Sequence, residues 1–270
     1  VDKNENFPFM MSPAISLVWS PNTKDFARLS FSSALRNPTL ADQYLFLDVG
    51  PATLVGNLNG IQGLATIQSF IDYREATPPV GSIGMDRDFI EYFDIAPIRP
   101  EKVKTVEAGY RTTIGDKLYI DAGCYFSTYT DFIGYNIGLD IAFTDTSQFA
   151  PVQGIDVYRY AANSINEVKT QGASIGLQYY LNDKFSLTGN YSWNKLVKTN
   201  EDDPIIPAFN TPEHKFNLGI TARGLDAWDN NTWGFGVNYR WIQQFVFEGS
   251  PQFTGGIPQY DLVDAQINLY

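Results

Sequence analysis

The chain has 270 residues, enough for one large domain or two ordinary ones. Only 18% of its residues are charged while 15% are aromatic, which suits a protein with a large uncharged surface. The formal net charge of −11 argues against nucleic acid as a partner, and one cysteine, Cys124, excludes an internal disulfide.

Apolar and polar residues alternate with a period of two along most of the chain. This period is typical of β-strands with one apolar and one polar face. The segment 232–241 is the clearest example, because Trp233, Phe235 and Val237 alternate with glycines and Asn238. Cys124 falls on the apolar side of its strand, where we interpret it as a small hydrophobic residue.

The connections between the nine candidate strands alternate in length. In chain order, the short ones are Pro21–Asp25, Gly115–Asp116, Asn182–Lys184 and about Arg223–Asn231, and the long ones are about Asn37–Lys102, Asn136–Asp156, Lys198–Glu213 and Ile242–Gly256. A barrel that spans a membrane has this pattern, with tight turns on the periplasmic side and long loops outside. A soluble β-sandwich, in which two apolar faces meet, is the alternative.

The placement of aromatic rings favours the membrane. Trp233 and Trp241 close the two ends of one apolar stripe. Eight steps of ~3.3 Å, tilted by roughly 40°, cross ~20 Å, which is near the ~25 Å apolar band of outer-membrane barrels. Tyrosine and tryptophan prefer such interfaces. The predicted membrane-interface aromatics are Tyr179, Phe185, Tyr191, Trp193, Trp233 and Trp241.

The predicted fold class is therefore all-β: an antiparallel transmembrane β-barrel segment with short periplasmic turns and long extracellular loops. We expect a single unit over 1–270, with its longest extracellular loop at about 37–102. The sequence shows no nucleophile–histidine pair, phosphate loop or metal-ligand spacing. The lone histidine, His214, is interpreted as a residue at the barrel rim.

Several segments also resemble sequences of a known protein family. They are Ser12–Asn22 with Leu29–Thr39, then Arg99–Arg111, Tyr125–Ile133, Thr211–Gly219 and Tyr260–Ala265. In this order they resemble the middle-to-late barrel of TonB-dependent outer-membrane receptors, with a composition similar to receptors of Bacteroidota.

The resemblance implies a barrel of about 22 strands with an N-terminal plug inside it. The chain would be a fragment that lacks the plug and the last strands, and its ending differs from the family's aromatic terminal strand. The implied function is TonB-energised uptake of a scarce nutrient: an iron chelate, a vitamin, an oligosaccharide or a peptide. The implied location is the bacterial outer membrane. The implied partners are membrane lipid, TonB, the plug, the nutrient and a surface lipoprotein, without a cofactor or enzymatic activity. A passive porin-like or structural barrel is the alternative.

The long loop carries rings that could stack on a substrate. They are Tyr44, Phe46, Phe70, Tyr73, Phe89, Tyr92 and Phe93. The alternative is that they pack a small loop subdomain over the barrel mouth. Within this loop, the spacing of apolar residues predicts a short helix over Ile61–Ile71.

Two groups of charged residues complete the candidate sites. The polar strand faces carry charges that would face the lumen and contact a plug, or alternatively line a substrate path: Arg28, Arg36, Glu107, Arg111, Asp121, Lys215, Arg240 and Asp264. In the long loop, Asp86, Asp88, Glu91 and Asp94 form a weak candidate calcium site, although Arg87 interrupts it and a solvated acidic face is the alternative.

Overall fold

The computed structural model describes residues 2–4, 6–78, 80–82, 84–197, 205, 209–226, 231–248 and 254–269. Its largest element is a nine-stranded antiparallel sheet with the order β19-β16-β15-β14-β13-β10-β9-β4-β3. The strands are β3 (Ala14–Trp19), β4 (Phe26–Arg36), β9 (Glu101–Ile114), β10 (Leu118–Thr130), β13 (Val168–Tyr180), β14 (Phe185–Val197), β15 (His214–Asp226), β16 (Thr232–Ile242) and β19 (Tyr260–Leu269). The predicted all-β fold with nine barrel strands is confirmed. We call this element the barrel sheet.

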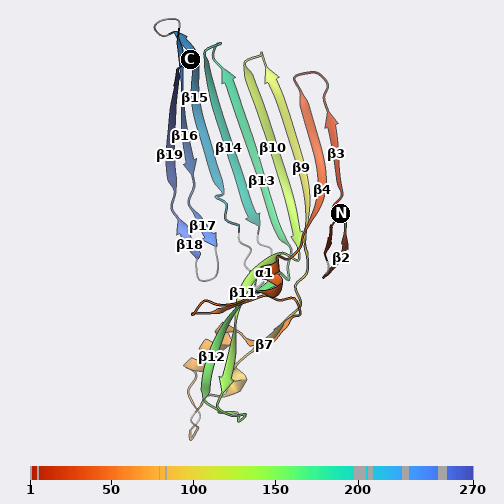
Figure 1. Ribbon diagram of the computed structural model, residues 1–270, viewed down its shortest axis with the longest axis vertical. Coiled ribbons are helices and arrows are strands. Elements are labelled where there is room, and N and C mark those ends of the chain that lie inside the picture. Colours follow the sequence, from red (N-terminus) through yellow and green to blue (C-terminus); the bar gives the residue numbers. More distant parts are fainter. Residues whose placement is uncertain are drawn as a thin grey trace.

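Tight turns gather at one end of the barrel sheet and long connections at the other (Figure 1). At the turn between β9 and β10, Gly115 and Asp116 both have positive φ angles, 57° and 56°. Positive φ angles at two successive residues give a tight turn a twist that matches that of the flanking strands. The connection here consists of residues 115–117, because Ile114 pairs with Leu118. Leu269, near the end of the chain, pairs with Trp233 at the tight-turn end.

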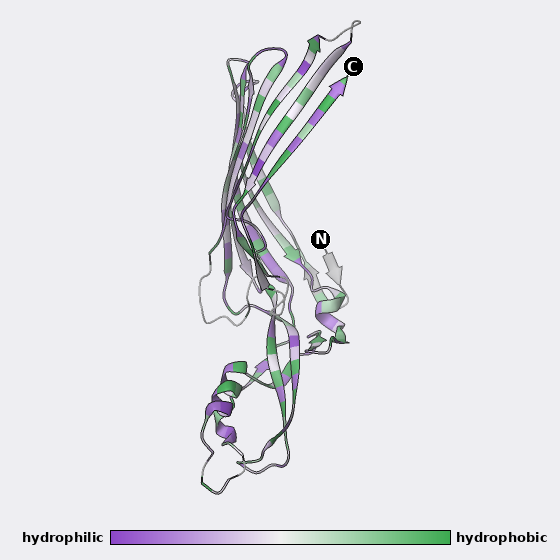
Figure 2. Ribbon diagram, turned by 90° about the vertical axis from the view of Figure 1, so that its left-hand side faces the viewer, coloured by the Kyte–Doolittle hydropathy of each residue, from purple (hydrophilic) through white to green (hydrophobic). Residues whose placement is uncertain are grey.

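The barrel sheet has one polar and one apolar face, because residues directly opposite each other in a ladder point to the same side. On the polar face, Arg240 pairs in register with Asn217, and Asn217 with Asn190. Arg240 Nε donates to Asn217 Oδ1 at 3.0 Å, and Asn217 Nδ2 donates to Asn190 Oδ1 at 2.8 Å. On the apolar face, Phe216 stacks on Trp241 with ring centroids 5.4 Å apart. The banding of hydropathy along the strands in Figure 2 reflects this alternation.

A second sheet lies beyond the long-loop end, built from residues 37–100 and 131–167, which we call the loop domain. Its six strands have the order β5-β6-β12-β11-β7-β8. They are β5 (Phe46–Asp48), β6 (Thr53–Val55), β7 (Ile61–Ala65), β8 (Tyr92–Ile95), β11 (Ile133–Phe143) and β12 (Val152–Asn163), accompanied by α1 (Leu40–Tyr44), α2 (Ile67–Glu75) and the 3-10 helix η1 (Arg87–Phe89). Two connections that are distant in sequence therefore form one unit. Two small hairpins complete the described elements: β1 (Asp2–Asn4) with β2 (Phe7–Met10), and β17 (Phe245–Glu248) with β18 (Thr254–Ile257).

Two expectations about these loops were wrong. The second long connection runs from Asp131 to Glu167 rather than over Asn136–Asp156, because β11 and β12 leave the barrel sheet and pair with each other. Their alternation looks like that of a barrel strand, and a period of two does not say which sheet a strand joins. The prediction of one helix over Ile61–Ile71 is also wrong, because the first half of this segment is strand β7. The helix α2 begins only after Thr66, whose Oγ1 accepts a hydrogen bond from Ser69 N at 3.2 Å.

The loop domain has its own apolar core. One cluster joins Ala65, Tyr73 and Ile90 to Leu139 and Ile141. A second joins Leu64 to Tyr160 and Ala162, and Ile205 of the third long connection also belongs to it. Both clusters contain residues from each of the two connections, so neither connection could bury these side chains alone.

The loop domain does not lie symmetrically over the barrel sheet. Figure 2 shows that the edges of the barrel sheet bend toward one side, and that α1 and β5 lie on that side while α2 lies on the other. None of the helices in the described residues is both long enough and apolar enough to cross a membrane.

Candidate functional site

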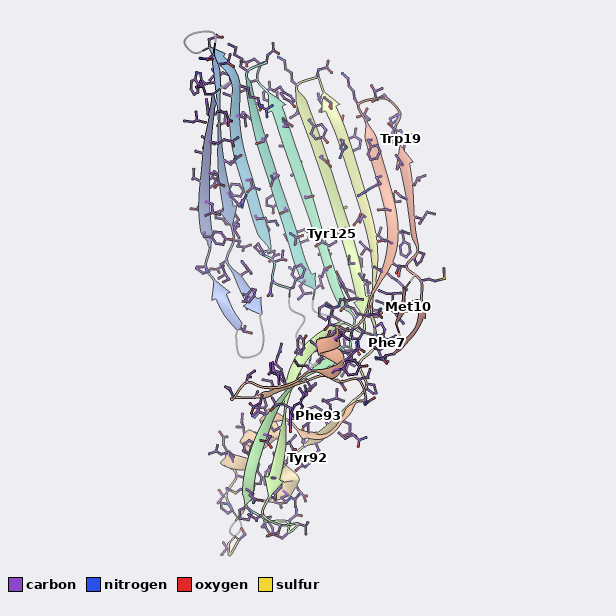
Figure 3. All side chains as sticks on the ribbon, viewed as in Figure 1. Phe7, Met10, Trp19, Tyr92, Phe93 and Tyr125 are labelled. Carbon is purple, nitrogen blue, oxygen red and sulfur yellow. The ribbon has the colours of Figure 1, made fainter. Side chains whose placement is uncertain are left out.

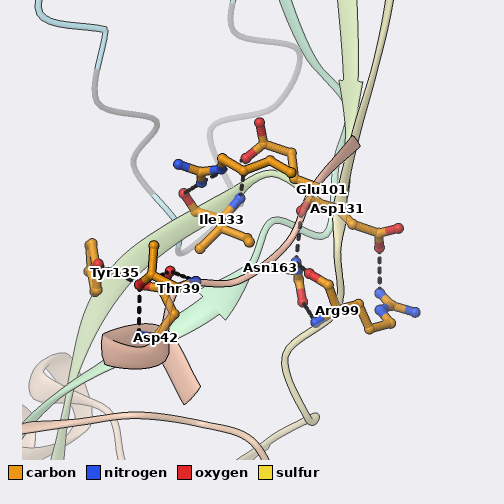
Figure 4. Close-up of polar contacts among 9 residues, drawn as sticks. Thr39, Asp42, Arg99, Glu101, Asp131, Ile133, Tyr135 and Asn163 are labelled. Atoms are coloured by element: carbon orange, nitrogen blue, oxygen red, sulfur yellow. Dashed lines mark hydrogen bonds and ion pairs between the residues drawn. The ribbon is translucent and has the colours of Figure 1, made fainter. Parts of the chain in front are cut away.

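A buried carboxylate fastens the loop domain to the barrel sheet. Glu101 Oε2 accepts from Arg36 Nη2 at 2.9 Å and from the backbone N of Ile133 at 3.0 Å (Figure 4). Arg36 Nη2 also donates to the carbonyl of Ile133 at 3.2 Å. Glu101 begins β9, Arg36 ends β4 and Ile133 begins β11, so this contact sets where the second connection leaves the barrel.

A second polar group holds α1 against β11. Thr39 and Asp42 form a capping box at the start of α1, and Tyr135 Oη donates to Asp42 Oδ1 at 2.7 Å. The Arg159 guanidinium lies over the Tyr135 ring at 3.9 Å. Burial and the hydrogen bond to Asp42 raise the pKa of Tyr135 to about 12, and burial lowers the pKa of Arg159. Tyr135 therefore stays protonated and keeps donating to Asp42 at all physiological pH values.

One hollow lies where the loop domain meets the ends of β10 and β13. It has a volume of about 820 Å³ and is lined in part by Phe93, Ile95, Tyr160 and Ile165. Polar groups at its rim already bond to one another. Arg99 Nη2 pairs with Asp131 Oδ1 at 2.7 Å, and Asn163 Nδ2 donates to the carbonyls of both residues at 2.8 and 2.7 Å (Figure 4). These satisfied contacts join the two connections of the loop domain close to the barrel sheet, and they leave few groups to recognise a ligand.

A smaller hollow, which we call the aromatic groove, lies beside α1 and β5. It has a volume of about 500 Å³ and is lined by residues that include Tyr44, Phe46, Gln62, Asp140 and Tyr158. The Phe46 side chain is 77% exposed and Tyr44 is 56% exposed. Exposed rings beside a hollow offer a surface on which a ligand can stack.

Polar groups of the aromatic groove are available to a ligand. Within the described residues, the side chains of Gln62, Asp140 and Tyr158 make no hydrogen bond to protein. Burial, with Asp156 and Asp140 nearby, raises the pKa of Tyr158, which stays a neutral donor. The groove lining contains no lysine or arginine. The arrangement can therefore stack on a flat ligand surface and bond to hydroxyl, amide or cationic groups.

The rings predicted in the long loop divide into two sets. Three of the rings belong to the loop-domain core or pack on it: Phe70, Tyr73 and Phe93. Tyr73 is only 4% exposed, and the ring centroids of Phe93 and Tyr160 are 6.1 Å apart. These three rings therefore fit the alternative in which they pack a small loop subdomain, rather than the one in which they stack on a substrate. The other set is exposed: Tyr44 and Phe46 at the aromatic groove, and Phe89 and Tyr92 outside it. Figure 3 labels Tyr92 and Phe93, which are neighbours on β8.

Gln62, Asp140 and Tyr158 were not predicted from the sequence. Asp140 and Tyr158 belong to the second connection and reach the groove only because β12 pairs in parallel with β6. No local pattern around them indicates this pairing.

All eight charged residues predicted for the lumen lie on the polar face of the barrel sheet, as the strand registers show. Two of the contacts on this face are ion pairs: Arg28 with Glu107 at 3.4 Å and Arg111 with Asp121 at 3.0 Å. The same face holds Tyr125, labelled in Figure 3, whose hydroxyl donates to Asn194 Oδ1 at 3.0 Å. The face is thus a bonded polar surface, and its exposure to a lumen stays a prediction.

The predicted interface aromatics lie on the opposite, apolar face and near its two ends. Tyr179 and Phe185 flank the turn between β13 and β14. At the long-loop end, Trp193 Nε1 donates to Glu213 Oε1 at 3.1 Å, and Tyr191 Oη bonds with His214 Nδ1 at 2.6 Å. Trp233 and Trp241 lie near the two ends of β16. Tyr191 and Trp193 therefore each combine a ring on the apolar face with a polar partner, which suits a ring at an interface.

The weak calcium site is not supported. Asp86 Oδ1 accepts from the backbone N of Asp88 at 3.0 Å and from Gln148 Nε2, while Asp94 Oδ1 accepts from Gly63 N at 2.9 Å. These carboxylates fix turns in different places. In the part of the chain that the structure describes, no three His, Cys, Asp or Glu side chains gather as a metal site.

The comparisons with known proteins agree with this architecture. The family model described as TonB dependent receptor-like, beta-barrel matches residues 2–270, so the chain belongs to this family. Membership places it in the bacterial outer membrane, as predicted from the resemblance. A search of curated proteins finds no match.

Solved structures share the fold at low sequence identity. A mutant of the ferric enterobactin receptor PfeA from Pseudomonas aeruginosa is 13% identical with a TM-score of 0.57, over 95% of this chain and 32% of that one. The FrpB iron transporter from Neisseria meningitidis (F3-3 variant) is 13% identical with a TM-score of 0.55, over 96% and 32%. The copper transporter OprC is 16% identical with a TM-score of 0.52, over 95% and 30%. The chain thus spans about a third of the length of these structures.

Proposed function

We propose that the chain is part of a TonB-energised receptor that takes up a scarce nutrient, and that the aromatic groove contacts this nutrient first. The observation that supports the proposal is the loop domain, which combines exposed rings with unpaired polar groups beyond the long-loop end of a family barrel. The polar face of the barrel sheet would line the path and contact a plug. A surface lipoprotein partner is a further expectation from the family resemblance.

The lining of the aromatic groove narrows the nutrient class. Asp140 gives the groove a negative charge, and no lysine or arginine in the lining offsets it. An anionic iron chelate would be repelled, whereas rings and neutral hydrogen-bonding groups suit a neutral or cationic ligand. We therefore favour an oligosaccharide, a peptide or a neutral vitamin over an acidic chelate.

Uptake by cells tests the proposal. The receptor is expressed in the outer membrane of cells that depend on it, and uptake of a panel of labelled chelates, vitamins, oligosaccharides and peptides is measured with and without functional TonB. We expect one class to accumulate only when TonB is present. Accumulation that persists without TonB would instead indicate a passive pore, the alternative function.

A matched pair of variants tests the groove itself. Phe46→Ala removes the most exposed ring of the groove. We expect nutrient binding to weaken by about ten-fold to a hundred-fold, because burying a phenylalanine ring stabilises a contact by roughly 1.5–3 kcal/mol. Phe89→Ala removes another exposed ring, outside the groove, and should leave binding unchanged. Equal losses in both variants would place the site elsewhere on the loop domain.

A further inference from the structure

The loop domain carries most of the net charge of the chain. Its residues, 37–100 and 131–167, include 13 aspartates and glutamates, four arginines and no lysine, so its formal charge is −9 out of the −11 of the whole chain. The rest of the chain contains 17 acidic and 15 basic side chains and is close to neutral. A surface with such an excess of negative charge attracts cations and raises their concentration beside it.

Two of these carboxylates differ from others that hold the fold together. Asp42 caps α1, and Asp131 pairs with Arg99 at 2.7 Å. Asp140 and Asp156 are exposed instead, and within the described residues neither side chain makes a hydrogen bond or an ion pair. Their charges are therefore available to a ligand.

Asp140 and Asp156 lie directly opposite each other in the ladder of β11 and β12. Side chains in this position are about 5 Å apart, and like charges there destabilise the sheet. Arg159 is the one basic residue in the six strands of this sheet, and it lies on the opposite face, over the Tyr135 ring. A repulsion that the protein does not compensate is typical of a functional site rather than of a structural one.

The rings of the aromatic groove share a face with the two aspartates. Tyr158 is two residues from Asp156 on β12 and therefore points to the same side of the sheet. Asp140, Tyr158 and Phe46 line the groove together. Aromatic ring faces attract cations, so the carboxylates and the rings favour the same kind of ligand group.

The spacing of the acidic groups favours an organic cation over a metal ion. In the described parts of the chain, no three His, Cys, Asp or Glu side chains lie close enough to hold a metal. A lysine or arginine side chain combines a charge with a long apolar stem, which packs on rings while the charged end reaches a carboxylate.

The edge of the sheet favours a peptide as the carrier of this cation. β5, which holds Phe46, is the outermost strand of the six-stranded order and pairs only with β6. The other side of an edge strand presents backbone N–H and C=O groups, which an extended peptide can pair with as an added strand. A free amine could use the groove but not this edge.

We propose that the aromatic groove binds a short peptide through a lysine or arginine side chain, which packs against Phe46 and Tyr158 and reaches Asp140 and Asp156. The peptide backbone would lie along β5. This inference rests on the proposed function and narrows the nutrient to a basic peptide. α1 and β5 lie on the side toward which the edges of the barrel sheet bend, so the peptide would be held on that side (Figure 2).

Equilibrium dialysis of the full receptor, purified from outer membranes in detergent, tests this proposal. The probes are pools of short peptides with blocked ends and uncharged residues, except for a central lysine, norleucine or glutamate. We expect the lysine pool to bind about ten-fold more tightly than the norleucine pool, from an exposed ion pair and a cation–π contact together. The glutamate pool should bind least. Equal binding of the lysine and norleucine pools would overturn the proposal, and so would equal binding of the lysine pool and cadaverine, a free amine.

Matched variants separate the two aspartates from the general charge of the domain. Asp140→Asn/Asp156→Asn should remove the advantage of the lysine pool, and it should not weaken the fold, because it removes a repulsion. Asp72→Asn/Asp88→Asn removes the same charge from α2 and η1, outside the groove, and should keep that advantage. Equal losses in both variants would overturn the proposal, since they would indicate long-range attraction alone.

A charge reversal guards against an effect of misfolding. Asp140→Lys should bind the glutamate pool more tightly than the unaltered receptor does, and a misfolded variant would not gain this binding. An unchanged order of the three pools in Asp140→Lys would overturn the proposal.

Failure of this inference differs from failure of the proposed function. If Phe46→Ala weakens the lysine and norleucine pools equally, and the two pools bind alike, the groove is a nutrient site without a preference for basic groups. If Phe46→Ala leaves the binding of every pool and of the accumulated nutrient unchanged, the groove is not the site, and both proposals fail.

Discussion

The barrel sheet and the loop domain are both antiparallel for the most part, yet they are stabilised in different ways. In the barrel sheet each strand pairs with the next barrel strand along the chain. Large apolar side chains of this sheet, such as Leu29 and Ile267, are exposed. In the loop domain, Ala65 and Ala161 are fully buried, and polar residues such as Asn57 are buried with them.

This difference in burial reflects the solvent around each region, which is lipid for the barrel sheet and water for the loop domain. The barrel sheet exposes its apolar face because lipid covers it, so its strands can be recognised by period alone. The loop domain stands in water and must bury its own apolar surface, which it does by combining two connections.

An arginine on the apolar face should damage the barrel sheet most. Ile175→Arg places a charge on this face near the middle of β13, and we expect a loss of roughly 2–4 kcal/mol in the free energy of unfolding. The matched variant Gln178→Arg places the same charge on the polar face and should cost less than about 0.5 kcal/mol. Urea titration of the receptor refolded in liposomes measures both, and similar values would mean that the two faces do not differ in solvent.

In the loop domain, a buried amide should matter more than any exposed one. Asn57 Nδ2 donates to the carbonyls of Ala96 and Ala161 at 2.9 and 3.0 Å, and so links the two connections. Asn57→Ala leaves both carbonyls without this partner, at a cost of roughly 2–3 kcal/mol confined to the loop domain. Limited proteolysis should show cleavage within 37–100 and 131–167 while the barrel stays resistant. Gln68→Ala, on the surface of α2, serves as the control and should leave the digestion pattern unchanged.

The smallest effect concerns pH. Burial raises the pKa of Tyr160 to about 12, and burial with the Asp42 hydrogen bond raises that of Tyr135 to a similar value. Because the folded state prefers the protonated phenols, their contribution to stability is complete below about pH 10 and is lost as the pH rises through about 12. Absorbance at 295 nm should show a late ionisation phase that shrinks in Tyr160→Phe and again in Tyr135→Phe. The late phase should vanish in the unfolded receptor; its persistence there would show that packing is not its cause.

The strands and turns of the barrel sheet could be predicted from the sequence. Alternation of apolar and polar residues identified the strands, the turn residues Gly115 and Asp116 marked a reversal, and paired aromatics such as Trp233 and Trp241 indicated the limits of the membrane. Each of these signals is local. The apolar face of a barrel strand is covered by lipid and not by a distant segment of the chain, so the alternation within the strand is enough to identify it.

The strand pairing of the loop domain and the composition of its groove became visible only in the tertiary structure. β11 and β12 have the alternation of barrel strands but pair outside the barrel, and Glu101 at the junction determines where they leave it. Asp140 and Tyr158 join Phe46 in one groove through a parallel pairing between connections far apart in the sequence. Such contacts depend on which surfaces must be hidden from water together, and that is a property of the assembled domain rather than of any segment.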